Sequence, residues 1–151
     1  MTRSACLVLA LSLLASGDAG AGVENPPALE PALAHCLEQI ERAFRGGDSN
    51  ALRGLLPQES KVLVGLESFA RPRGYYSRDQ VVRILRQIFD ASESTRFQFD
   101  RERGDLSRGS IYYVPAAWSL RGSGPVQQCR LQFMLRKEGP TFVIREMKEV
   151  R

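Results

Sequence analysis

The strongest constraint on the fold is a strict alternation of side chains in residues 127–136. A period of two is typical of a β-strand with one buried face. The positions predicted to face inward are Cys129, Leu131, Phe133 and Leu135. The positions predicted to face outward are Arg130, Gln132, Met134 and Arg136. Turn signals at 122–125 and 138–140 join this strand to predicted strands at 110–120 and 141–150, which makes an antiparallel meander.

Helical patterns precede the meander. Apolar residues share one stripe of a predicted helix that begins at Ala32 and ends at Gly46-Gly47: Leu33, Cys36, Leu37, Ile40 and Phe44. A short helix is predicted at 50–56, and a capping box that begins at Ser77 opens a third over 78–89. Strands are predicted at 61–66 and 95–100, with a short one at 75–76. This order predicts an α+β fold with three N-terminal helices on a curved, mostly antiparallel sheet. Pro115 predicts an interruption or bulge in the strand over 110–120.

The N-terminus has the order of regions that defines a secretory signal peptide. One positive charge at Arg3 precedes an apolar run at 5–15, and the small residues at 19–21 fit a cleavage site. The run is too short to span a bilayer. We therefore predict a signal peptide at 1–21, an extended Pro-rich linker at 22–31 and one domain at 32–151. The mature protein is expected in the periplasm or outside the cell, without membrane association; a buried N-terminal helix is the alternative.

Two cysteines remain after cleavage, Cys36 and Cys129. Both lie on predicted apolar faces that meet between helix and sheet, and an exported protein meets oxidising conditions. These facts favour a disulfide between them, with two buried free thiols as the alternative.

Charge and histidine content exclude several classes of function. The net charge is +4, but arginines are scattered and interleaved with acidic residues, as at 101–105, which does not indicate nucleic-acid binding. The single histidine, His35, cannot supply the clusters of zinc or iron sites. We expect no metal and no cofactor.

Several segments resemble a known superfamily. They are 76–81, 84–89, 97–99, 131–137 and 142–147. Together with the terminal meander they resemble the nuclear transport factor 2-like (NTF2-like, SnoaL-like) superfamily, and within it a small bacterial exported family of unknown function of the DUF4783 type. The resemblance implies a cone-shaped, cystatin-like fold.

The resemblance leaves the function open. Ketosteroid isomerases and polyketide cyclases of this shape hold an acidic or histidine base in the cone, but the inward positions here are apolar, so no catalytic residue is predicted. A non-catalytic domain that binds a small ligand or a protein is the leading hypothesis. An isomerase or cyclase is one alternative, and anion or polymer binding through Arg71, Arg73 and Arg78 is another.

Candidate binding residues come from two places. Around the start of the third helix they are Arg71, Arg73, Tyr75 and Tyr76. On the outer sheet face, Arg130, Gln132 and Met134, with Trp118 or Tyr112, have the composition of an interface core, which predicts a homodimer. A mixed, half-exposed sheet is the alternative.

Overall fold

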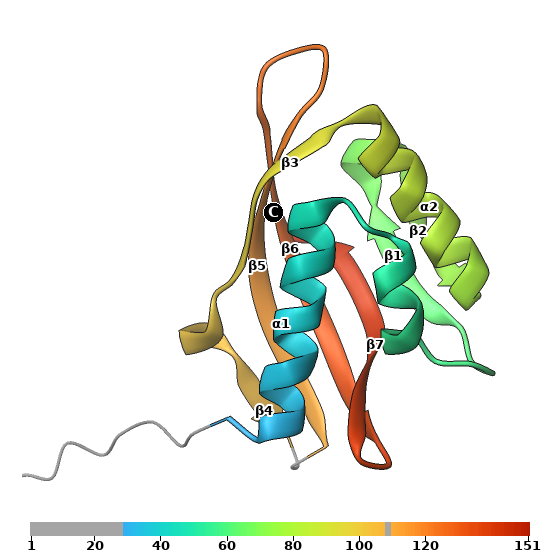
Figure 1. Cartoon of the computed structure of the whole chain (residues 1–151), viewed down its shortest axis with the longest axis vertical. Helices are drawn as coiled ribbons and strands as arrows, with labels where there is room; N and C mark the ends of the chain where they lie inside the picture. Colours follow the sequence, from blue (N-terminus) through green and yellow to red (C-terminus); the bar gives the residue numbers. More distant parts are fainter. Residues whose placement is uncertain (1–28, 108–109) are drawn as a thin grey trace, which may run out of the picture.

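The computed structural model describes residues 29–107 and 110–151 (Figure 1). The predicted signal peptide and most of the linker lie outside these residues. The helical elements are α1 (Pro31–Gly46), η1 (Asn50–Leu55), η2 (Glu67–Phe69), α2 (Arg78–Ala91) and η3 (Arg101–Arg103), where η marks a 3-10 helix. The strands are β1 (Val62–Leu66), β2 (Arg71–Tyr76), β3 (Glu93–Phe99), β4 (Asp105–Ser107), β5 (Ile111–Arg121), β6 (Gln127–Glu138) and β7 (Thr141–Glu149). In the described part of the chain, no helix is long and apolar enough to cross a membrane.

The two long helices begin at or within one residue of the predicted positions, and α1 ends at the predicted glycines. Pro31 occupies the first turn of α1, where its missing N–H costs nothing. Gly47 takes a φ of 64° and its N–H bonds the Ala43 carbonyl, which ends α1. At α2, Ser77 and Gln80 form the predicted capping box with reciprocal side-chain to backbone hydrogen bonds.

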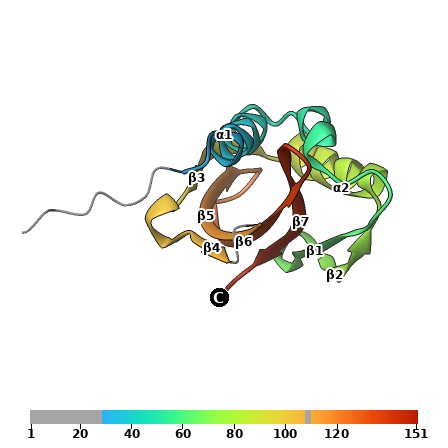
Figure 2. The same cartoon turned by 90° about the horizontal axis from the view of Figure 1, so that it is seen from below.

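The strands form one seven-stranded sheet with the order β2-β1-β7-β6-β5-β3, and β4 also pairs with β5. All pairs are antiparallel except β1 with β7. The sheet curls around α1 and α2, which lie on its concave side (Figure 2). The α+β, mostly antiparallel architecture predicted from the sequence is thus confirmed.

Pro115 does not interrupt β5, contrary to expectation. The β5–β6 register runs without a shift, and Pro115 lies opposite Gln132. The Pro115 carbonyl accepts a hydrogen bond from the Asp100 N–H at 2.9 Å, on the other edge of β5. Because N and C=O of one residue point to the same neighbour in an antiparallel strand, the missing N–H faces the gap between β3 and β4. The proline therefore removes no bond from the β5–β6 ladder.

The concave face of the sheet and the apolar stripes of the helices form one core. The positions of β6 predicted to face inward are all buried, and so are Phe97 and Phe99 of β3; the β6 residues are Cys129, Leu131, Phe133 and Leu135. Phe44 of α1 packs at the centre, with its ring centroid 4.4 Å from that of Phe97, 5.0 Å from Trp118 and 5.8 Å from Phe133. These stacked and edge-to-face pairs fill the space that a cone could leave open.

Candidate functional site

Trp118 and Tyr112 lie on the inner face of the sheet, so their predicted place on the outer face is wrong. Their exposed fractions are 1% and 2%. Across β5–β6 they oppose Cys129 and Leu135, and directly opposed residues point to the same face. The Trp118 indole N–H donates to the Ser94 hydroxyl at 3.0 Å, which satisfies its polar atom inside the core. Trp118 is therefore a core residue and not an accessible binding residue.

The disulfide prediction is also wrong, because Cys36 and Cys129 are buried free thiols. The Cys36 thiol lies 3.5 Å from the Phe142 carbonyl oxygen, and Phe142 pairs with Lys137 of β6. Cys129 lies eight residues along β6 from Lys137, which is roughly 26 Å of strand. A disulfide requires Cα atoms within about 7 Å. Both cysteines face the same core, but at opposite ends of it.

The outer face of the sheet carries a row of side chains that crosses six strands. In the register, Tyr75 opposes Leu63, Leu63 opposes Glu146, and Glu146 opposes Met134. Met134 then opposes Tyr113, and Tyr113 opposes Asp105 at the far end. Opposed residues share a face, so these six form one continuous row, called here the outer row. Tyr75, at the β2 end, is 69% exposed.

The predicted outward positions of β6 lie on the outer face, Met134 within the outer row and Arg130 and Gln132 beside it. Arg130 is exposed, and Gln132 and Met134 are half-buried. Arg130 and Gln132 line a surface hollow of about 660 Å³ together with Tyr113 and Pro115 of β5. The outer face is therefore a mixed surface of aromatic, methionine and charged side chains, and none of the helices in the described residues covers it (Figure 2).

The arginines proposed for anion binding do not converge. Arg71 bonds Gln87 near the C-terminal end of α2. Arg78 lies in the first turn of the same helix and donates to the Pro57 carbonyl at 3.4 Å. Gln87, which bonds Arg71, and Arg78 itself are nine residues apart on α2, a distance of roughly 13 Å along the helix. Arg73 is exposed on β2.

Tyr76 is tied down by its own strand. Its hydroxyl donates to the Pro72 carbonyl at 3.0 Å. It is partly buried against the core, which agrees with an aromatic packing role rather than with a free donor aimed at a ligand.

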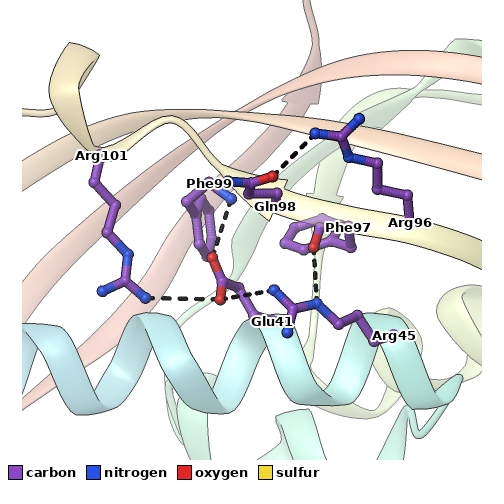
Figure 3. A network of polar contacts seen from close by, with 7 residues as sticks. All are labelled: Glu41, Arg45, Arg96, Phe97, Gln98, Phe99 and Arg101. Carbon is purple, nitrogen blue, oxygen red and sulfur yellow. Dashed lines mark hydrogen bonds and ion pairs between the residues drawn. The ribbon is translucent and has the colours of Figure 1, made fainter.

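A polar network between α1 and β3 was not predicted. Glu41 is 8% exposed, and its carboxylate is the centre of the network (Figure 3). One oxygen accepts the Phe99 backbone N–H at 3.1 Å. The other lies 3.2 Å from the Arg45 guanidinium and 3.6 Å from that of Arg101. The Arg45 Nε–H donates to the Phe97 carbonyl at 2.9 Å.

This network completes an edge of the sheet. β3 has no strand beside its outer edge in the sheet order of the described residues. The Phe97 carbonyl and the Phe99 N–H both point to that edge, because alternate residues of an antiparallel strand bond to the same side. Glu41 and Arg45, one turn apart on α1, supply the acceptor and the donor that a neighbouring strand would supply. Covering an edge in this way protects it from pairing with another chain.

The network borders a surface cleft of about 590 Å³ between α1, β3 and η3. Arg45, Arg96, Gln98 and Arg101 line it with Glu41. In Figure 3, Arg45 and Arg101 approach the Glu41 carboxylate from opposite sides. Arg96 bonds the Gln98 amide oxygen at 3.1 Å.

The sequence contained a faint signal for this network. Glu41 lies four residues after Leu37 and three before Phe44, at the edge of the apolar stripe, and Arg45 follows one turn later. Only the position of β3 beside α1 turns this edge carboxylate into a buried one.

Comparison with known proteins identifies the fold. No family model and no curated protein matches the chain. A DUF4783 family protein from Bacteroides ovatus matches with a TM-score of 0.57 and 12% identity over 74% of this chain and 90% of that one. An NTF-2 like protein of unknown function from Shewanella oneidensis matches with a TM-score of 0.58 and 13% identity over 78% of this chain and 95% of that one. The chain has the NTF2-like fold.

A third solved structure comes from Catenulispora acidiphila. It is a hypothetical protein with a ketosteroid isomerase-like fold, in complex with trimethylamine, and matches with a TM-score of 0.58 and 14% identity over 77% of this chain and 84% of that one. At such identities the likeness is one of fold. The resemblance in the sequence thus predicted the fold correctly, while the chemistry of this NTF2-like domain depends on its own residues.

One further buried polar group lies at the end of β5. The Tyr112 hydroxyl is buried with no hydrogen-bond partner in the described structure. It fills the space where a Cβ on Gly104 would stand, at 1.8 Å. Burial raises the pKa of Tyr112, and the nearby Arg101 partly offsets this effect. Gly104 is thus required by contact with the core.

Proposed function

We propose that this chain is an exported, non-catalytic NTF2-like domain that pairs with a second copy of itself through the outer face of the sheet. The observation that carries the proposal is the outer row, on a sheet face that no helix of residues 29–107 or 110–151 covers. Tyr75, Leu63, Met134 and Tyr113 supply its apolar and aromatic surface. Aromatic and methionine side chains are enriched at the centres of protein interfaces.

The filled interior supports a non-catalytic role. An isomerase or cyclase of this fold needs an ionisable group inside an open cone. Here the rings of Phe44, Phe97, Trp118 and Phe133 occupy the interior. Burial raises the pKa of the thiols of Cys36 and Cys129 to about 12 and about 11, with Glu149 adding to the second shift. Protonated thiols do not act as bases at neutral pH.

The charges on the outer face favour a second copy over a partner of one charge sign. Asp105 and Glu146 belong to the outer row, while Lys148 lies on the next row of the same face and Arg130 on the row beyond it. In an interface with two-fold symmetry, each patch meets its own copy in reverse, so a patch of mixed sign can complement itself. Each copy must bury about 800 Å² to form a stable pair of standard size.

The test is the mass of the protein in solution as a function of concentration. We expect analytical ultracentrifugation to show a dimer that dissociates on dilution, and Met134→Glu to weaken it at least tenfold because the new carboxylate adjoins Glu146. Gln58→Glu, in the exposed loop between η1 and β1, adds the same charge and leaves the dimer intact. A wild-type monomer at every concentration, or a dimer unaffected by Met134→Glu, would contradict the proposal.

Export rests on the order of regions in residues 1–21. We expect the full-length chain, expressed in a bacterium, to be recovered outside the cytoplasm with a new N-terminus near Gly22. Mass spectrometry of the intact protein measures this directly. An uncleaved chain that stays in the cytoplasm would contradict export without affecting the dimer.

A further inference from the structure

The cleft between α1 and β3 has more hydrogen-bond donors than its network uses. A guanidinium carries five N–H donors. Arg45 uses its Nε–H on the Phe97 carbonyl and another N–H on Glu41. Arg96 uses one on Gln98, and Arg101 approaches Glu41 with one. Among the described residues, most donors of these three side chains are therefore open to solvent or to a ligand.

Glu41 positions two of these arginines but cannot neutralise both. One of its oxygens is taken by the Phe99 N–H, and the other is shared by Arg45 and Arg101. The side chains of Arg45 and Arg101 keep 56% and 37% of their surface exposed, while that of Glu41 keeps 11%. The carboxylate is thus buried behind two guanidinium groups whose remaining N–H groups are available at the surface.

The acidic residues that line the same cleft reduce the net positive charge of its lining. Asp100 lies 4.0 Å from Arg103, a residue outside the lining, and Glu102 lies in η3. The lining therefore carries three guanidinium groups and three carboxylates, one of which is buried. With no large excess of charge, recognition must come from placed guanidinium donors, which match planar or tetrahedral oxyanions with paired hydrogen bonds.

We propose that this cleft is a binding site for a small ligand with a carboxylate or phosphate group, held by Arg45, Arg96 and Arg101, with Glu41 as the positioning residue. The site is separate from the outer row, because it lies at the free edge of β3 beside α1 (Figure 3). It differs from the predicted anion site, whose arginines are on β2 and α2. Its volume of about 590 Å³ falls within the range of small-molecule sites.

The experiment titrates the full-length protein with citrate and, separately, with inorganic phosphate at constant ionic strength. Amide proton–nitrogen NMR spectra report both binding and its place. We expect saturable shifts at the Phe97 and Phe99 amides with at least one probe. Saturation by citrate alone identifies a carboxylate ligand, and saturation by phosphate alone a phosphate ligand; both support the site.

Arg96→Gln is the decisive variant, because within the described structure Arg96 bonds only the neutral Gln98, so its loss leaves the Glu41 network in place. We expect it to weaken binding about tenfold, the effect of losing a charged hydrogen bond. Arg86→Gln on α2, where Arg86 bonds Asn50 at 3.0 Å, removes the same charge far from the cleft and leaves the affinity unchanged. No saturation with either probe, or equal weakening by both variants, would overturn the proposal. Neither outcome bears on dimer formation.

Discussion

The two faces of the same sheet have opposite characters. On the concave face, every second residue of β6 from Cys129 to Leu135 is apolar and buried, and aromatic rings from four elements meet in one cluster. On the outer face, the residues between them are arginine, glutamine and methionine, and these remain partly exposed. Successive residues of β6 therefore alternate between the two faces of the sheet.

The difference separates stability from recognition. The concave face holds the fold together, and its aromatic rings fill the interior of the cone. The two proposed binding surfaces, the outer row of the sheet and the cleft beside β3, both lie outside that interior. The edge of β3 lies where the core meets the surface. Glu41 is buried between α1 and β3, and it also lines the surface cleft.

The largest expected effect comes from opening the concave face. Phe44→Ala removes the ring that contacts Phe97, Trp118 and Phe133, and should lower the free energy of unfolding by about 3–5 kcal/mol. Tyr75→Ala, on the outer face, should change it by less than about 0.5 kcal/mol in the monomer. Urea denaturation measures both values. Equal losses would show that the two faces do not differ in this way.

A smaller effect should follow from crowding the end of the core. Gly104→Ala places a methyl group 1.8 Å from the Tyr112 hydroxyl, which is buried, so one of the two must shift. We expect a loss of about 1–3 kcal/mol in the free energy of unfolding. Gly124→Ala meets no atom within 4 Å and serves as the control. If Gly104→Ala is as stable as the control, the packing of Tyr112 is looser than described.

Substitutions of Glu41 test how much its hydrogen bond to the β3 edge contributes to stability. Glu41→Ala leaves the Phe99 N–H without its acceptor and should cost about 1–2 kcal/mol. Glu41→Gln keeps an acceptor oxygen and should cost less, since ion pairs with exposed arginines contribute little. Urea denaturation gives both values, and hydrogen exchange at the Phe99 amide should quicken only in the alanine variant. Equal costs for the two variants would assign the effect to charge and not to the β3 edge.

The last effect is absent at neutral pH and appears only in alkaline solution. The buried thiol of Cys36 has its pKa raised to about 12, so the unfolded chain loses this proton first, near pH 9. Stability is then full below pH 9 and falls as pH rises toward 12. Urea midpoints measured from pH 8 to 11 should fall more steeply in the wild type than in Cys36→Ala. Identical slopes would indicate a thiol in contact with water.

Periodicity predicted the local structure well. The alternation in 127–136 predicted β6 and both of its faces, and the capping box predicted where α2 begins. Each of these signals depends on residues close together in the chain, where spacing alone defines geometry. The helix stripe of Leu33, Leu37 and Phe44 is likewise buried as predicted.

The errors concern position along and between strands. Alternation within β5 did not show which set of its residues faces the core, so Trp118 was assigned to the wrong side. Cys36 and Cys129 face the same core but do not meet, because the core is long and the two residues lie at opposite ends of it. Pro115 was expected to break β5, but the free backbone position that admits it depends on where β3 ends and β4 begins.

The sequence by itself determined the two long helices, most of the strands, the α+β class and the inward face of β6, because these follow from hydrophobic spacing and from end signals within each segment. It did not predict β4 or the full length of β2. The tertiary structure alone decided the parallel pairing of β1 with β7, the outer row and the burial of Glu41 against the β3 edge. These features join residues far apart in the chain through register and packing. Both candidate sites are of this second kind, which is why local patterns pointed to the fold more clearly than to the function.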